Sequence, residues 1–217
     1  MLMEEIINNI TVVLISHKSR NKVISFVKNF SNKIKIIIIE NSNDKLIKKE
    51  IEKINPLVKI IFSPNNGYGS AINLASKSIK TNYFFVFNPD VENINDLILK
   101  KFLDIAKKLN DSFACIGPRY INISKKTLIQ SDCNKEIDTL PSISGASMFF
   151  NKDKFNNIGG FDENFFLYFE ETDYCLRAKK MKLLSYQLNT VKVNHRVGTS
   201  VENSDKNEQK KFNNLLR

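Results

Sequence analysis

The chain has 217 residues, of which 42% are hydrophobic, and a formal net charge of +10. This length suits one compact domain, and the hydrophobic content is well above that of a disordered chain. The three cysteines are widely spaced and match no disulfide framework or zinc motif, which fits a reducing compartment. Neither a signal peptide nor an apolar run near the ~18 residues that span a bilayer is found, so we expect a cytoplasmic protein, soluble or peripheral at a membrane.

The positive charge alone would suggest nucleic-acid binding, because basic surfaces bind phosphates with release of counterions. It comes almost entirely from lysine, however, and arginine occurs only at positions 20, 119, 177, 196 and 217. Readout of base edges favours the bidentate arginine fork. We therefore expect no nucleic-acid partner. Attraction to a phosphate-bearing substrate or an anionic membrane surface explains the charge at least as well.

Short apolar runs alternate with amphipathic segments through the first half of the chain. Runs rich in β-branched and aromatic residues predict strands at 10–16, 35–40, 58–63 and 83–87. Apolar residues at helical spacing predict helices within 23–30, 47–54, 71–79 and 99–106. Strand and helix alternate four times, which predicts an α/β domain with a mainly parallel, Rossmann-like sheet and helices on both faces.

The second half of the chain is less regular. After residues 114–117 the alternation breaks into shorter pieces, with strand-like stretches near 127–131, 147–150 and 191–193. A helix is predicted from about 169 to 181. We find no linker, repeat or low-complexity tract, so we expect a single domain over 1–203 and a polar tail at 204–217.

Two short motifs follow predicted strands. Asn65-Asn66-Gly67-Tyr68-Gly69 opens a helix, where backbone N–H groups can bind an anion, but it lacks the Gly-Lys-Ser/Thr of a P-loop. Asn88-Pro89-Asp90 ends a strand, and a carboxylate at that edge of a parallel sheet points towards the usual ligand crevice. A hard cation such as Mg²⁺ is bound by one or two carboxylates together with phosphates. Both motifs are also compatible with ordinary turns that bind nothing.

The strongest stretch is 159–173, in which five carboxylates fall within twelve residues among aromatic side chains. Glu170 and Asp173 share one face of the predicted helix, and Glu171 is next to them. Acids at a helix start are favoured by the helix dipole, which is the purely structural interpretation. Poor solvation and mutual repulsion would raise a carboxyl pKa, which suits a general base. A lone histidine such as His195 is more often structural than a metal ligand, unless it joins Asp90.

Taken in order, the motifs resemble family 2 glycosyltransferases of the GT-A fold, and within them the rhamnosyltransferase-like branch. The resemblance runs from about residue 10 to residue 200. It is carried by TVVLISH, IIIIENSND, NNGYGSAIN, FNPDV, SISGASMFF, GGFDENFFLYFEETDYCLR and HRVGTS. It implies a nucleotide-binding half at about 10–113 and a smaller, mixed acceptor and catalytic half at 114–200.

The resemblance also implies roles for individual residues. Asp90 would be the sole carboxylate ligand of Mg²⁺ or Mn²⁺, because Asn88 replaces the first acid of the family's metal motif, and His195 would be the second ligand. Residues implied for nucleotide binding are Ser16, His17, Glu40, Asn41, Asn66, Gly67, Asn73 and Asn88. Residues implied for substrate binding are Gly145, Ala146, Asp162 and Glu163.

The family's catalytic Glu-Asp pair is Glu170-Glu171 in this sequence, which implies Glu171 as the base, with Asp173 as a rival and Glu170 in support. The implied reaction is inverting, metal-dependent transfer of a sugar such as rhamnose from a nucleoside-diphosphate-sugar. The implied acceptor is a glycan or polyprenyl-linked hydroxyl in bacterial surface polysaccharide synthesis, with peripheral contact at the inner membrane. Alternatives are a nucleotide-sugar-binding protein without turnover and a basic nucleic-acid-binding α/β domain.

Overall fold

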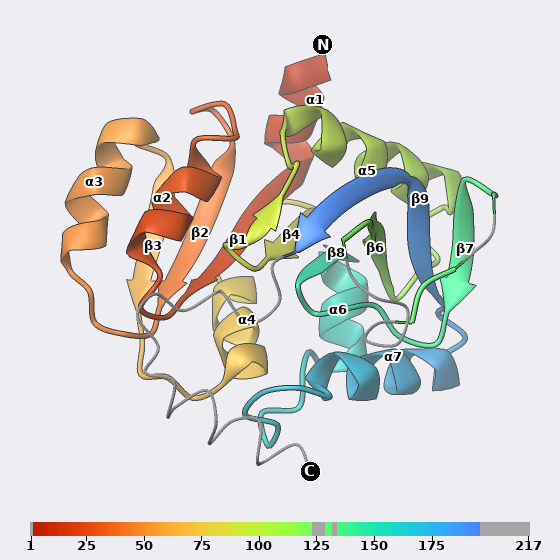
Figure 1. Ribbon diagram of the computed structural model, residues 1–217. Helices are drawn as coiled ribbons and strands as arrows, with labels where there is room; N and C mark the ends of the chain where they lie inside the picture. The colour runs from red at the N-terminus through yellow and green to blue at the C-terminus, as the bar shows by residue number, and fades with distance from the viewer. Residues whose placement is uncertain (1, 123–128, 132–133, 196–217) are drawn as a thin grey trace.

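The computed structural model describes residues 2–122, 129–131 and 134–195 (Figure 1). The strands are β1 (Ile10–Ser16), β2 (Lys35–Glu40), β3 (Val58–Phe62), β4 (Tyr83–Phe87), β5 (Val91–Glu92), β6 (Cys115–Tyr120), β7 (Ile137–Leu140), β8 (Ser147–Asn151) and β9 (Ser185–His195). The helices are α1 (Leu2–Asn9), α2 (Arg20–Val27), α3 (Leu46–Ile54), α4 (Tyr68–Ser76), α5 (Asp96–Lys108), α6 (Lys152–Ile158) and α7 (Glu170–Lys180).

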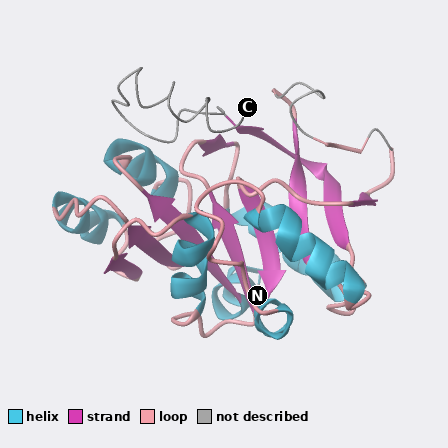
Figure 2. Cartoon of the chain, turned by 90° about the horizontal axis from the view of Figure 1, so that it is seen from below, coloured by secondary structure: helices cyan, strands magenta, loops and turns pink. Residues whose placement is uncertain are grey.

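The strands form one mixed sheet in the order β3-β2-β1-β4-β8-β6-β9-β5, with β7 paired to β9. Strands β3, β2, β1 and β4 are mutually parallel, as the alternation of strands and helices predicts. In the second half β8 runs antiparallel to β4 and β6, whereas β6 and β9 are parallel. Figure 2 shows the strands side by side in a twisted row with helices around them. The prediction of an α/β domain with a smaller mixed half is confirmed.

The central strands are buried on both faces. Val12 and Leu14 of β1 belong to one hydrophobic core, and Val13 between them belongs to the other. The first core lies under α1, α2, α3 and α5, and the second lies under α4, α6 and α7 (Figure 1). Since successive side chains of a strand point to opposite faces, only a continuous apolar run such as KIIIIE of β2 can fill both layers.

Several elements differ from the sequence-based expectation. Helices α1 and α6 and strand β7 were not predicted, because each has only four to eight residues, a short length for recognising a periodic pattern. Strand β9 is longer than the predicted 191–193, since it buries the polar side chains of Gln187 and Asn189, which bond to each other. In the strand expected near 127–131, residues 127 and 128 lie outside the described residues, and 129–131 form no strand.

One tertiary contact places the acidic segment. Residues 159–169, here called the acidic loop, pack against the N-terminal end of α4. Gly67, which caps α4, has φ +105°, and a Cβ there would lie 2.5 Å from the carbonyl oxygen of Phe166. The Tyr68 N–H donates a 2.9 Å hydrogen bond to that same oxygen. A Cβ at Gly69 would lie 2.9 Å from the Cβ of Phe161. Two glycines of the sequence motif therefore permit close approach of the acidic loop.

Side chains from two helices fix the start of the acidic loop. Asn73 of α4 accepts from the Phe161 N–H at 3.0 Å and donates to the Phe161 carbonyl at 2.9 Å. From α7, Arg177 donates to the carbonyl oxygens of Ile158 and Gly160 at 2.7 and 2.6 Å. As a result the first turn of α7 has a fixed position beside α4.

Replacing Gly67 with alanine is expected to destabilise the protein. The backbone conformation at this position is open essentially to glycine alone, which costs other residues about 1–3 kcal/mol, and the clash with Phe166 adds to this cost. Urea unfolding followed by circular dichroism measures the loss. Gly145→Ala is the matched control, because a Cβ added at Gly145 would have its nearest neighbouring atoms 3.5 and 3.9 Å away. Equal stabilities of the two variants would contradict the proposed packing.

Candidate active site

The expected nucleotide-binding residues follow two paired strands. Strands β1 and β2 are parallel with Ser16 opposite Glu40, so His17 and Asn41 come next at the same edge of the sheet. Within the described part of the chain, the buried atoms His17 Nδ1 and Asn41 Oδ1 have no hydrogen-bond partner. Buried polar atoms in proteins nearly always have partners, so this pair is suited to bind polar groups of a ligand.

The neighbouring polar residues instead fix the turns around this position. Glu40 Oε1 accepts hydrogen bonds from the N–H and the hydroxyl of Ser42. Arg20 donates to both carboxylate oxygens of Asp44, at 2.6 and 2.8 Å. Ser16 Oγ lies 3.3 Å from Ser19 Oγ. These residues shape the site, and the described contacts leave the Glu40 carboxylate committed to its own turn.

Two residues of the Asn-Gly motif and its helix contact the acidic loop. Asn66 is exposed, whereas Gly67 and Asn73 contact the acidic loop. Asn73 also donates to Glu163 Oε1 at 3.0 Å. The described contacts of this motif are therefore contacts within the protein.

Asp90 and His195 lie close together. Strand β4 ends at Phe87, and after a turn Val91 of β5 pairs with His195 of β9. This pairing brings Asp90 Oδ1 to 3.3 Å from His195 Nε2, with the Asp90 side chain 2% exposed and that of His195 10%. His195 Nε2 makes no hydrogen bond to a described residue, so it can be a ligand atom.

A carboxylate oxygen and an imidazole nitrogen fit a divalent cation such as Mn²⁺. Among the described residues no group of three or more His, Cys, Asp and Glu side chains could hold a metal ion. Two protein ligands fit an ion of the Mg²⁺ type that takes its other ligands from water and phosphate. The pair therefore fits a metal that arrives with a phosphate-bearing substrate.

Tyr68 lies between this pair and the acids of α7. Its hydroxyl donates a 2.7 Å hydrogen bond to the Gly145 carbonyl, and next along the chain the Ala146 carbonyl accepts from the Asn88 N–H at 2.9 Å. Burial raises the pKa of Tyr68, and the negative charges of Glu170 and Asp90 raise it further. A Cβ added at Gly145 would lie 3.5 Å from the Tyr68 ring and 3.9 Å from Glu170 Oε1, so the Tyr68 ring and the first acid of α7 meet at Gly145.

Glu170 is buried with one carboxylate oxygen unpartnered among the described residues. Its side chain begins α7, the residue is 3% exposed, and Oε2 has no hydrogen-bond partner among the described residues. Burial raises the pKa of Glu170 to about 7, and repulsion from Glu171 contributes. Burial also raises the pKa of Glu171, which is partly exposed. Glu171 is thus the acid of this pair that solvent or a substrate can reach.

The other acids of the stretch have partners within the protein. Asp173 Oδ2 accepts a 2.7 Å hydrogen bond from Arg177 Nε. Asp162 Oδ1 accepts from the N–H and the side-chain amide of Asn164 at 2.9 and 2.8 Å. Glu163 accepts from Ser70 at 3.1 Å as well as from Asn73. The structure therefore brings Glu170 and Glu171 to the site and uses the remaining three to fix the acidic loop and α7.

Two tyrosines of the site are not indicated by the sequence motifs. Tyr68 stands inside the Asn-Gly motif, but that motif points to its backbone N–H groups and not to this side chain. Tyr120 of β6 has a buried hydroxyl, and its ring centroid lies 6.0 Å from that of His195. No local pattern marks Tyr120, because its place in the site depends on the pairing of β6 with β9.

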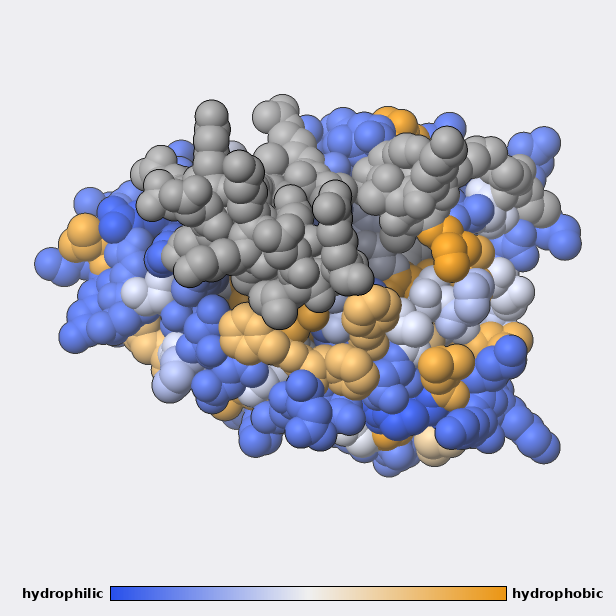
Figure 3. Space-filling model, turned by 60° about the horizontal axis from the view of Figure 1, so that its bottom comes forward, coloured by the Kyte–Doolittle hydropathy of each residue, from blue (hydrophilic) through white to orange (hydrophobic). Residues whose placement is uncertain are grey.

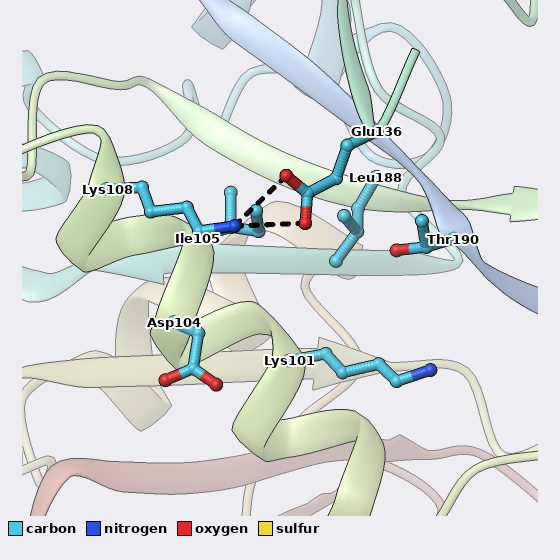
Figure 4. Close-up of a pocket in the computed structure, with 7 residues that line it drawn as sticks. All are labelled: Lys101, Asp104, Ile105, Lys108, Glu136, Leu188 and Thr190. Carbon is cyan, nitrogen blue, oxygen red and sulfur yellow. Dashed lines mark hydrogen bonds and ion pairs between the residues drawn. The ribbon is translucent and has the colours of Figure 1, made fainter. Parts of the chain in front are cut away.

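A separate hollow lies between α5 and β9 (Figure 4). In it Lys108 donates to both carboxylate oxygens of Glu136 at 3.1 Å. Its lining is Lys101, Asp104, Ile105, Lys108, Glu136, Leu188 and Thr190. None of the expected site residues is among them, so this hollow has no part in the site described above.

Glu170 is expected to make stability depend on pH. Its pKa is raised above the usual carboxyl value, so the folded state binds the proton more tightly than the unfolded state, and stability falls as pH rises from about 4.5 through about 7. Glu170→Gln should remove most of this fall, which is on the order of 3 kcal/mol. Urea unfolding at pH 5, 6, 7 and 8 measures it, with the exposed Glu52→Gln as control. If the free energy of unfolding changed with pH equally in Glu170→Gln and in wild type, the raised pKa of a buried Glu170 would be refuted.

Solved structures with a similar fold include two glycosyltransferases. The crystal structure of GalNAc-T7 with UDP, GalNAc and Mn²⁺ matches with a TM-score of 0.67 and 14% identity, over 91% of this chain and 45% of that one. S. aureus TarS 1–349 in complex with UDP-GlcNAc matches with a TM-score of 0.65 and 14% identity, over 91% and 61%. The chain thus spans less than two thirds of either structure, and this likeness establishes the GT-A fold.

Sequence comparison agrees with the fold. The "Low-salt glycan biosynthesis hexosyltransferase Agl10" of Haloferax volcanii is 20% identical over 214 residues, which cover 88% of this chain and 68% of that protein. Within the described residues, no helix is long and apolar enough to cross a membrane. The model of the family "Glycosyl transferase family 2" matches residues 11–177. The chain belongs to this family.

Proposed function

We propose that the chain transfers a sugar from a nucleoside-diphosphate-sugar to an acceptor hydroxyl, with inversion at the anomeric carbon. The observation that carries the proposal is that the close pair Asp90–His195 and the acids Glu170 and Glu171 all lie near Tyr68, whose pKa is raised by burial and by the charges of these acids. Family membership supports the reaction class. GalNAc-T7 and TarS, which share the fold, were crystallised with UDP and with UDP-GlcNAc.

The nucleoside would bind after the ends of β1 and β2. His17 Nδ1 and Asn41 Oδ1 offer buried polar atoms without partners among the described residues, and a nucleobase or ribose can supply those partners. The turns held by Glu40 and by the ion pair of Arg20 with Asp44 keep this part of the site in shape before ligand binds.

The diphosphate would lie beside Asp90 and His195, which would hold Mg²⁺ or Mn²⁺. When bound, this ion offsets the negative charge that develops on the leaving nucleoside diphosphate. Asn88, whose N–H is fixed to the Ala146 carbonyl, sets the turn that presents Asp90. Tyr68 holds the Gly145 carbonyl, and so ties the start of α4 to the loop whose next residue, Ala146, fixes Asn88.

Glu171 is the proposed base. As the acceptor oxygen forms its bond to the anomeric carbon, the bond from that carbon to the diphosphate oxygen breaks, and the hydroxyl proton passes to Glu171. Its raised pKa suits proton removal near neutrality, and its partial exposure leaves it accessible. Asp173 is less suited because Arg177 occupies its carboxylate. Glu170 lies buried beside Glu171 and is the second acid of this part of the site.

The acceptor that we propose is a glycan or a polyprenyl-linked glycan of a surface polysaccharide, reached at the cytoplasmic face of a membrane. The motif resemblance to the rhamnosyltransferase-like branch makes rhamnose the first donor sugar to test. The similarity to a hexosyltransferase named for glycan biosynthesis supports this substrate class. A basic chain with a net charge of +10 also suits an anionic membrane surface.

The reaction is tested by release of nucleoside diphosphate from a panel of donors, with and without Mn²⁺. Glu171→Gln is expected to lower kcat by about 10²- to 10⁴-fold, the usual contribution of a general base. Asp90→Ala should lower the rate and abolish its dependence on Mn²⁺. Asp153→Asn is the matched control, because it removes an acidic side chain from the first turn of a different helix, α6.

Each remaining outcome has a distinct meaning. Full activity of both Glu171→Gln and Asp90→Ala would overturn the proposed roles. If Glu170→Gln lost activity and Glu171→Gln kept it, Glu170 would be the base instead. Donor binding without turnover, under every condition tested, would show a nucleotide-sugar-binding protein. Salt-sensitive RNA or DNA binding that nucleoside diphosphates do not displace would favour the nucleic-acid alternative.

A further inference from the structure

The segment that leads into α7 carries exposed aromatic side chains. Phe166 is 51% exposed, Tyr168 44% and Phe169 60%. Most phenylalanines of the described chain are instead fully buried in the two cores. Grouped exposure of large apolar side chains is more informative than single exposed residues, and it marks an interaction site. These three residues are called the aromatic rim below.

The aromatic rim lies on the face at the bottom of Figure 1, where α4 and α7 meet the acidic loop. Figure 3 turns this face forward and shows apolar surface near its centre with hydrophilic surface around it. The Phe166 carbonyl is fixed by the Tyr68 N–H at 2.9 Å. Tyr168 and Phe169 have φ of +69° and +71°, a conformation that such residues keep only when their surroundings enforce it. The outward direction of the rim is therefore imposed by the fold.

The rim adjoins the acids of the candidate active site. Phe169 directly precedes Glu170, whose buried Oε2 has no hydrogen-bond partner in the described part of the chain. Burial raises the pKa of Tyr168, and the nearby negative charges of Glu170 and Glu171 raise it further. A ligand that rests on the rim would consequently have the partly exposed carboxylate of Glu171 at one edge.

We propose that the aromatic rim is the platform on which a neutral pyranose ring of the acceptor stacks. The proposal rests on the function proposed above and names the chemistry of its acceptor. One face of a pyranose consists of C–H groups that pack on aromatic rings, and its edge carries hydroxyl groups. Stacking would direct one of these hydroxyls towards Glu171. The acceptor recognised at this position is thus a sugar ring, and not a lipid or a peptide.

Charge and size favour a sugar over a membrane or a protein. Four carboxylates share the segment with the rim, namely Asp162, Glu163, Glu170 and Glu171. Anionic lipid headgroups would be repelled by these carboxylates, although they attract lysine-rich surfaces elsewhere. Three side chains also offer far less area than the roughly 1,000 Å² that a stable protein interface needs. A single uncharged ring matches both the charge and the area.

The absence of tryptophan from this chain gives a direct test. Phe169→Trp places the only tryptophan on the rim, and its fluorescence can be titrated with methyl glycosides of glucose, galactose, mannose, rhamnose and N-acetylglucosamine. At least one glycoside should change the emission saturably, without any nucleotide present. Leu97→Trp on α5 is the matched control, since Leu97 is also 60% exposed, and its emission should not respond. If Phe169→Trp does not fold, Phe166→Trp replaces it.

Adding vesicles and varying the protein concentration give the results that would contradict the proposal. A blue shift with phosphatidylglycerol vesicles but with no glycoside would show membrane insertion and overturn the proposal. A shift that follows protein concentration alone would show self-association and overturn it as well. No response to any addition, in a variant that still hydrolyses the donor, would refute the rim and leave the proposed function intact. A saturable glycoside response in a chain that turns over no donor would instead contradict the function and support the rim.

Discussion

The docking of residues 159–169 onto the start of α4 is the contact on which the rest of the site depends. It is possible because Gly67 and Gly69 carry no side chain where the backbone of Phe166 and the Cβ of Phe161 approach. The hydrogen bond from Tyr68 to Phe166 then uses one of the free N–H groups of the helix start. A feature that suggested anion binding in the sequence thus also positions the acidic loop. It brings the first turn of α7 to the same region as the end of β4.

The site that results contains charge that the described residues do not neutralise. Glu170 is almost fully buried with one oxygen unpartnered among them, and the neighbouring acid, Glu171, repels it. Burial of a carboxylate without partners costs stability, and natural proteins keep such groups mainly where function requires them. Asp173 shows the contrast, because Arg177 pairs with it on the same helix. Adjacent acids of one helix therefore divide into a pair with raised pKa values and a structural ion pair.

Much of the fold could be predicted from the sequence, because the periodicity of buried side chains is a local property. KIIIIE of β2 predicts a strand buried on both faces, and Asn88-Pro89-Asp90 predicts a carboxylate at the strand end. Long-range pairings have no such signal. That Val91 pairs with His195, and so brings His195 to Asp90, follows from the order of the whole sheet, and in the sequence only the family resemblance implied that these two residues meet. Residue roles are less predictable for the same reason. Asn73 was expected at the nucleotide, but its amide binds the backbone of Phe161, which is 88 positions away in sequence.

The central claim is that the acids at the end of β4 and at the start of α7 face a single sugar. A crystal structure of the chain with Mn²⁺ and a nucleoside-diphosphate-sugar tests it most directly, with the donor chosen by thermal stabilisation. The account predicts the diphosphate beside Asp90 and His195, and the anomeric carbon on the side that faces Glu171. A donor bound with its sugar directed away from α7, or held outside the region around Tyr68, would contradict it.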